Sequence, residues 1–96
     1  MLISHATFSA GVDCTMEFKE SHIGKIIGQE TGGMNACYID CLDYRLPHSS
    51  LDCNISYKHF IYAGADEGHT HGVLPDHEVP AQDALEYTLK LINTKQ

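Results

Sequence analysis

The pattern of hydrophobic and polar positions divides the chain into short segments. Apolar stretches bounded by glycine, proline or polar residues predict strands, at residues 1–4, 25–29, 37–44 and 53–62. In the last of these, Cys53, Ile55 and Tyr57 occupy alternating positions, which is typical of a strand with one covered face. The stretch from Leu46 to Ser50 contains a proline and two serines, so the last two strands are predicted to form a hairpin.

The end of the chain predicts a helix that packs against the sheet. Pro80 suits the first turn of a helix, because that turn leaves its N–H groups unpaired and proline has none to leave. From residue 81 onward the apolar positions follow the helical period. The predicted stripe consists of Ala81, Ala84, Leu85, Thr88 and Ile92.

Residues 10–21 fit two interpretations. The apolar residues there are Ala10, Val12, Cys14, Met16 and Phe18. From Val12 onward they alternate with polar residues, a period of two that favours a strand. In a helical projection Ala10, Cys14 and Phe18 share one face, as in a helix buried between two layers. Val12 and Met16 then share the other face. The choice matters because a helix beginning beside Ser9 would direct its positive end toward that serine.

The turn Thr7-Phe8-Ser9-Ala10-Gly11 carries the candidate chemistry. A serine at a turn from strand to helix is exposed, and the amides that follow it face the group it attacks. Ser9 is therefore a candidate nucleophile. The alternative is that Ser9 only turns the chain or caps a helix, which is the common role of serine in such turns.

Four segments in succession resemble the C-terminal half of the catalytic domain of the S41 serine peptidases. This family comprises C-terminal processing peptidases, tricorn core proteases and retinoid-binding-protein-like relatives. The segments are LISHATFSAG at 2–11, GKIIGQETGG at 24–33, EGHTHGVLPD at 67–76 and AQDALEYTLKLIN from residue 81. The resemblance implies an α/β fold with a crotonase/ClpP-like β-α core, of which residues 1–96 are the C-terminal portion, with a β-hairpin and a closing C-terminal helix. It also implies a helix directly after the serine, so we predict a helix over residues 10–21.

The resemblance assigns a role to each site residue. It implies a serine endopeptidase that cuts peptide bonds through an acyl-enzyme, with Ser9 as nucleophile, the Ala10 N–H as oxyanion donor and Glu67 as an auxiliary acid. The lysine of the processing-peptidase branch falls on Met34, which cannot accept a proton from a hydroxyl. Glu67 stands where the tricorn-like branch has its glutamate, so the chain is placed nearer to that branch. The histidine base of that branch would precede residue 1, and the 96 residues alone are expected to be inactive.

Two other functions stay open. One is a non-catalytic binding module of the same fold, as in the retinoid-binding relatives. The other is a metal site, because His69 and His71 at alternating positions could share Zn²⁺ or Ni²⁺ with Glu67 or His77 as a third ligand. The segment around them also matches a family motif that needs no metal, so the favoured prediction includes neither a metal nor a cofactor.

Other candidate groups near the serine are given minor roles. His5 is separated from Ser9 by an extended stretch and a turn, which argues against contact between them. Lys19 and Lys25 are weak candidates for the base, since a lysine base would have to be desolvated. Asp76, after a proline, is expected to serve a turn or a cap.

Charge and composition narrow the partners. Thirteen acidic residues against six lysines and arginines give a formal charge of -7 with no basic run, which argues against nucleic acid and anionic membranes. No apolar run approaches the roughly 20 residues that cross a bilayer. The expected partners are a peptide or protein substrate and a second copy, in a homo-oligomer or strand-exchanged dimer, because half a domain leaves sheet edges open. The family resemblance favours a periplasmic or secreted envelope location over the cytoplasm.

The cysteines predict no zinc site. They are Cys14, Cys37, Cys41 and Cys53, and they lack the paired spacing of a structural zinc motif. We expect free, half-buried thiols that behave as small hydrophobic side chains.

Overall fold

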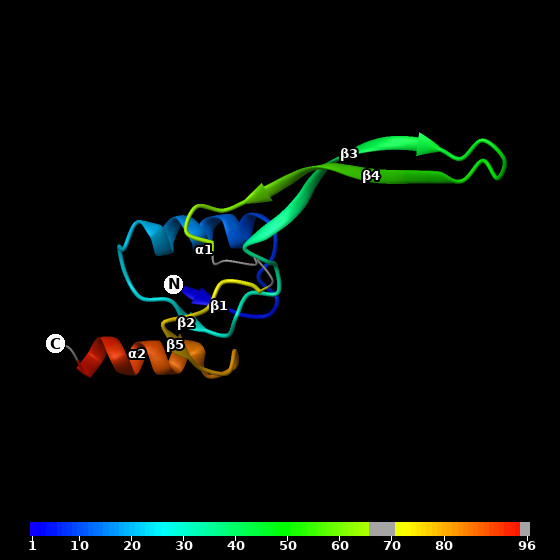
Figure 1. Cartoon of the computed structure of the whole chain (residues 1–96). Coiled ribbons are helices and arrows are strands. Elements are labelled where there is room, and N and C mark those ends of the chain that lie inside the picture. Colours follow the sequence, from blue (N-terminus) through cyan, green and yellow to red (C-terminus); the bar gives the residue numbers. More distant parts are fainter. Residues whose placement is uncertain (66–70, 95–96) are drawn as a thin grey trace.

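The chain folds into a small α/β body from which one long β-hairpin projects (Figure 1). The computed structural model describes residues 1–65 and 71–94. Its longest dimension is 66 Å, against 26 and 19 Å in the other two directions. The mixture of helices, parallel strands and antiparallel strands confirms the predicted α/β class.

Three short parallel strands form the sheet of the body. They are β1 (Leu2–Ile3), β2 (Ile27–Gly28) and β5 (His77–Glu78), in the order β1-β2-β5. Hydrogen bonds extend the pairing on both sides of β2, from Ile27 N–H to the Met1 carbonyl at 2.9 Å and from Val79 N–H to the Gly28 carbonyl at 2.8 Å. Parallel sheets are covered on both faces, which explains why Ile26 and Ile27 are both buried.

One helix covers each face of this sheet (Figure 1). Helix α1 (Ala10–Glu20) contributes Val12 and Met16 to an apolar cluster with Val73. Helix α2 (Ala84–Thr94) packs on β2, where Ala84 and the half-buried Leu91 join Ile27 and Val79. The core is therefore two small apolar clusters separated by the sheet.

Helix α1 confirms the helical interpretation of residues 10–21, but not the expectation that two of its faces are buried. Its buried residues are Val12, Thr15 and Met16. Ala10 and Cys14 are exposed instead. The reason is that the body covers only the side of α1 that faces the sheet, and nothing in the described part of the chain lies on the other side.

Helix α2 begins three residues later than predicted. The Asp83 N–H donates to the Pro80 carbonyl at 2.9 Å, so residues 80–83 form a turn before the helix. Ala84 and Thr88 face the body as predicted. The other members of the predicted stripe are exposed, namely Ala81, Leu85 and Ile92. The strands under α2 are only two residues long and cover a narrow strip of it, which is filled by Ala84, Thr88 and Leu91.

The hairpin joins β3 (Ala36–Arg45) to β4 (Asp52–Ile61) and confirms the two strands and the connecting loop predicted from sequence. Its antiparallel register runs from Ala36 opposite Ile61 to Arg45 opposite Asp52. No helix or other strand of the described chain makes more than marginal contact with it. The thiols of Cys14, Cys37, Cys41 and Cys53 are free. Cys37 and Cys53 are half-buried as predicted, but Cys14 and Cys41 are exposed, because no other described element covers the outer side of α1 or the outer hairpin.

Candidate functional site

Ser9 occupies the N-cap position of α1, yet its side chain does not cap the helix. The residue is exposed, and its hydroxyl makes no hydrogen bond to the helix amides. Its backbone has φ 50° and ψ -120°, a combination that glycine adopts freely and other residues avoid. Holding a serine there costs on the order of 1–3 kcal/mol. Neither a simple turn nor a cap would require a side chain at this position.

A positive φ alone does not identify a functional residue. His22, Asp40 and Ser50 also have φ between 50° and 58°. Ser9 differs from them because it begins a helix and its free hydroxyl lies at a pocket. His22 also lines a hollow, but it lies beyond the other end of that helix. The combination of backbone strain, a free hydroxyl and a pocket makes Ser9 the leading candidate.

A glycine loop presses against the turn that carries Ser9. The Gly33 N–H donates to the Thr7 carbonyl at 3.0 Å. A Cβ atom on Gly33 would lie 2.6 Å from the Val12 Cγ2 atom, and one on Gly32 would collide with the Phe8 ring. Only glycine at these two positions lets the loop approach so closely, and the loop thereby holds the backbone on either side of Ser9.

Buried hydrogen bonds fix that loop in turn. The hydroxyl of Thr31, which is 3% exposed, donates to the Gly33 carbonyl and accepts from the Val73 N–H, each at 2.7 Å. The Glu30 carboxylate accepts from the Gly72 N–H at 2.8 Å. These bonds tie residues 30–33 to residues 72–73. The loop that packs against the Ser9 turn is therefore itself held in place by a second segment.

Ser9 opens into a pocket of about 660 Å³ between α1, the glycine loop and the base of the hairpin. The pocket is lined by Phe8, Ser9, Val12, Gly32, Gly33, Met34, Ala36, Cys37, Tyr38, Ile39, His59 and Tyr62. Its volume lies within the range of about 300–1,000 Å³ that is typical of ligand sites. Because most of the lining side chains are apolar or aromatic, the pocket suits an apolar group placed next to the serine.

The Ala10 N–H is free to bind a negatively charged oxygen. At this end of α1, Gly11 donates to the Phe8 carbonyl at 2.8 Å, and Val12 and Asp13 donate to the Ser9 carbonyl at 2.8 and 3.1 Å. Among the described residues, no acceptor lies against the Ala10 amide. The N-terminus of a helix favours negative charge, so this amide fits the predicted role of oxyanion donor.

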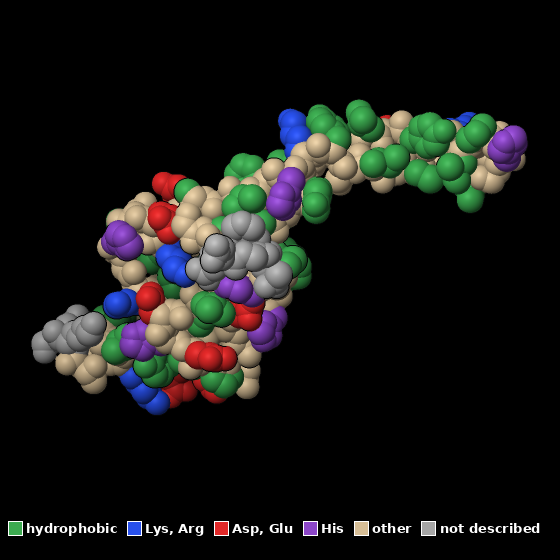
Figure 2. All heavy atoms as spheres, in the orientation of Figure 1, with side chains coloured by type: hydrophobic (Ala, Val, Ile, Leu, Met, Phe, Trp, Pro, Cys, Tyr) green, Lys and Arg blue, Asp and Glu red, His purple; other side chains and the backbone are tan. Residues whose placement is uncertain are grey.

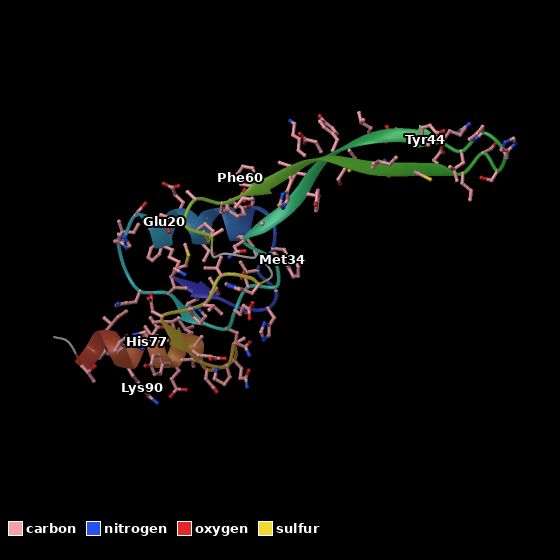
Figure 3. All side chains as sticks on the ribbon, in the orientation of Figure 1. Glu20, Met34, Tyr44, Phe60, His77 and Lys90 are labelled. Atoms are coloured by element: carbon pink, nitrogen blue, oxygen red, sulfur yellow. The ribbon has the colours of Figure 1, made fainter. Side chains whose placement is uncertain are left out.

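Of the other residues that the family pattern singled out, one lies beside Ser9 and one cannot be placed. Met34, which stands where a processing peptidase has its lysine, lines the same pocket as Ser9 and is labelled near the start of β3 in Figure 3. Glu67 lies outside the described residues, and so does His69.

The groups that were given minor roles lie elsewhere. His5 Nδ1 is 2.9 Å from the Glu30 carbonyl oxygen, and His5 does not line the pocket. Lys19 and Lys25 line a different hollow. The Asp76 carboxylate accepts from the Ile26 N–H at 2.8 Å, and this bond joins the segment before β5 to the segment before β2. The role of Asp76 is thus structural, but its side chain links two segments distant in sequence instead of the turn or cap that was predicted.

Sequence analysis missed the aromatic pair at the base of the hairpin. Tyr38 and His59 are opposite one another in the register, and their rings stack with centroids 4.7 Å apart and planes 22° apart. Both line the pocket that contains Ser9. Alternation along each strand assigns each side chain to one face of the hairpin, but only the register places the two side chains opposite one another.

The described residues contain no group of three or more histidine, cysteine, aspartate or glutamate side chains placed to hold a metal ion. His77, one of the ligands considered for a metal, has its Nδ1 atom 2.9 Å from the Tyr87 hydroxyl. Because Glu67 and His69 are not described, the metal hypothesis stays a prediction. Within residues 1–65 and 71–94, neither helix has the length and apolar character needed to span a bilayer.

No protein-family model matches this chain, and no curated protein matches it. The support for a function therefore comes from the geometry around Ser9 and from the residues that line its pocket.

Proposed function

We propose that Ser9 is the nucleophile of a serine hydrolase site that acts on peptide bonds, as the resemblance to S41 peptidases implies. The observation that carries this proposal is an exposed serine, held at φ 50° and ψ -120° at the start of α1, whose hydroxyl is not used as a cap. The turn from strand to helix is the arrangement that presents a nucleophilic serine in hydrolases of the α/β type. The free Ala10 N–H beside Ser9 adds support, because an oxyanion formed on attack by Ser9 needs such a donor.

In this mechanism the Ser9 oxygen bonds to the carbonyl carbon of the substrate while its proton passes to a base. The carbonyl oxygen becomes an oxyanion and accepts a hydrogen bond from the Ala10 N–H. One such donor contributes roughly 100- to 1000-fold in rate. Collapse of the intermediate breaks the peptide bond, the leaving amine takes the proton, and water then hydrolyses the acyl-enzyme.

The base is the part of the mechanism that the described pocket leaves open. The resemblance expects a histidine from a segment that precedes residue 1, with Glu67 as an auxiliary acid. Within the described lining, His59 is the one imidazole, and histidine is the commonest general base in catalysis. A His59→Gln variant distinguishes these sources, because it slows acylation only if His59 is the base.

A fluorophosphonate probe tests the nucleophile directly. In excess, and with the histidine base of the tricorn-like pattern present, the probe is expected to form one covalent adduct on Ser9, identified by peptide mass mapping and abolished in Ser9→Ala. Ser50 is the matched control, because it is also an exposed serine with positive φ but lies in the hairpin loop away from the pocket. The absence of an adduct, or equal modification of Ser9 and Ser50, would contradict the proposal.

A cysteine in place of Ser9 tests the surroundings without requiring a base. A thiolate at a helix N-terminus is stabilised by the helix, so Ser9→Cys is expected to react with iodoacetamide roughly tenfold faster than Cys14. Cys14 is the internal control, since it is exposed on the same helix one turn further on. Equal rates at the two thiols would show that the position of Ser9 has no activating effect.

A second candidate function is a binding module that uses the same pocket without chemistry. The apolar lining and Met34 in place of a lysine favour this alternative. It predicts that an apolar fluorescent probe binds with equal affinity to the wild-type chain and Ser9→Ala, while neither forms a fluorophosphonate adduct.

A further inference from the structure

The outer part of the β3-β4 hairpin has two faces of different chemistry. Side chains alternate along a strand, and residues directly opposite in register share a face. The register, continued by the hydrogen bond from Leu46 N–H to the Leu51 carbonyl at 2.9 Å, therefore assigns residues 41–46 and 51–56 to two faces. The polar face consists of Cys41, Asp43, Arg45, Asp52, Asn54 and Ser56. The apolar face consists of Leu42, Tyr44, Leu46, Leu51, Cys53 and Ile55.

Cross-strand contacts link the side chains of the polar face. Arg45 donates to both carboxylate oxygens of Asp52, at 2.7 and 3.1 Å. The Asn54 amide donates to the Asp43 carboxylate, and Cys41 Sγ lies 3.5 Å from the Ser56 hydroxyl. These pairs suit contact with water, so the polar face needs no further partner.

The apolar face, in contrast, is not covered by any described part of the chain. Leu42, Tyr44, Leu51 and Ile55 are each between 51% and 61% exposed. Hydrophobic side chains are visible along the whole arm in Figure 2, and Tyr44 is labelled toward its far end in Figure 3. An isolated two-stranded hairpin is marginally stable in water, and it gains stability when an apolar face is packed against another element.

We propose that this apolar face packs against the same face of a second copy of the chain, in a dimer with twofold symmetry. Such an interface is self-complementary, because each copy supplies the same residues. The two hairpins would lie about 10 Å apart, as packed sheets do. The proposal is independent of the chemistry of Ser9.

The area of the face is suitable for a dimer. Its five large apolar side chains are between 37% and 61% exposed. At about 100 Å² of exposed surface each, roughly half of a large side chain, they supply about 500 Å² per chain. Two copies would therefore bury about 1,000 Å² in total, to which the half-buried Cys53 adds, and this is about the lower limit for a specific interface.

The distribution of charge also favours a second copy. Each chain carries a formal charge of -7, which opposes self-association in general. No charged side chain belongs to the apolar face, however, and the charges of the outer hairpin lie on the opposite face as the Arg45–Asp52 pair and Asp43. Two copies can therefore approach through this face with little direct repulsion.

Sedimentation equilibrium with a pair of adjacent substitutions tests the proposal. Ile55→Lys places a charge in the apolar face, and it is expected to raise the dimer dissociation constant about 30-fold or more, as loss of a central interface residue does. Asn54→Lys places the same charge on the polar face and is expected to leave the dimer intact. A wild-type monomer, or equal dissociation in both variants, would overturn the proposal, as would a dimer that persists in Ile55→Lys through strand exchange or edge pairing.

The native thiols provide a second test without any substitution in the face. Cys53 lies on the apolar face and Cys41 on the polar face of the same hairpin. With rising protein concentration, maleimide labelling of Cys53 is expected to slow about tenfold, because dimer formation covers it, while labelling of Cys41 stays constant. Labelling of Cys53 that does not depend on concentration would also overturn the proposal, even if Ile55→Lys failed to fold.

Discussion

The body and the hairpin each contain strand isoleucines, but in opposite surroundings. Ile27 in β2 is 2% exposed and packs with Val79 and Ala84. Ile55 in β4 is 54% exposed and contacts no other helix or strand beyond its own hairpin in the described chain. Ile27 therefore stabilises the body through contacts within the chain, whereas Ile55 presents apolar surface that only another molecule or segment would cover.

This contrast shows what a local sequence pattern determines. Alternation within β4 predicts which face of the strand is apolar. It does not predict which element covers that face, because covering depends on residues distant in sequence or on another chain. The same limit applies to Ser9, whose turn is local but whose pocket is formed by the glycine loop and the base of the hairpin.

The largest expected effect is the difference in unfolding free energy between truncating a buried isoleucine of the body and truncating an exposed isoleucine of the hairpin. Ile27→Ala removes buried groups from the core and is expected to cost about 2–5 kcal/mol of unfolding free energy. Ile55→Ala makes the same chemical change at an exposed site and is expected to be nearly neutral in the monomer. Urea denaturation of both variants, followed by the helical circular dichroism signal, measures the difference.

Protein concentration sharpens this comparison. If the hairpin forms a dimer, Ile55→Ala becomes destabilising as concentration rises, because binding of the folded state adds to stability. Ile27→Ala costs the same at every concentration. Equal costs for the two variants at low concentration would show that the hairpin face is already covered within the monomer.

Much of the fold could be predicted from sequence because its signals are local. The strands of the hairpin, the helix after Ser9 and the free thiols are confirmed. The buried faces of α1 and α2 were predicted less well. They depend on strands only two residues long, and a periodic pattern does not show how narrow the covered strip is.

The candidate site could be predicted only in part. Ser9 and the amide of Ala10 follow from the turn itself. The contact between His59 and Tyr38 could not be predicted, because it depends on the register of the hairpin, which the pattern of the two strands does not specify. Glu67 was inferred from family spacing, and it lies outside the described residues.

A smaller effect is expected at Ser9, with the sign reversed. Ser9→Gly removes a side chain from a backbone conformation that glycine adopts without strain, and the substitution is expected to stabilise the body by about 1 kcal/mol. Ser50→Gly is the comparison within the hairpin, since Ser50 also has a positive φ. Thermal denaturation measures both variants.

The combination of higher stability with loss of the fluorophosphonate adduct in Ser9→Gly would indicate that stability is given up at Ser9 for function. A Ser9→Gly variant less stable than wild type would contradict this. The serine would then be supporting the turn through contacts of its side chain.

The smallest effect concerns the exposed ion pair on α2, Glu86 with Lys90 one turn later, at 2.7 Å. The hydrogen bond and charge of Lys90 lower the pKa of Glu86 below its usual 4.5, and those of Glu86 raise the pKa of Lys90 above its usual 10.5. A lowered carboxyl pKa stabilises the fold above the usual value, and this contribution disappears as pH falls through the shifted pKa. The raised lysine pKa acts in the opposite direction, so its contribution is complete below the usual value and disappears as pH rises through the shifted pKa.

Glu86→Gln is therefore expected to lower the melting temperature by about 2 °C or less at neutral pH. The difference from wild type is expected to shrink as pH falls through the lowered pKa of Glu86, and to disappear in 1 M salt, where the pair is screened. Asp52→Asn breaks the corresponding pair on the hairpin, where the Asp52 carboxylate accepts hydrogen bonds from Arg45 and raises the pKa of Arg45. If the body unfolds independently of the hairpin, this second variant leaves the melting temperature of the body unchanged. A shift in melting temperature as large as that of Glu86→Gln would show that the body and the hairpin unfold as one cooperative unit. The two regions would then be separate in structure but not in their unfolding.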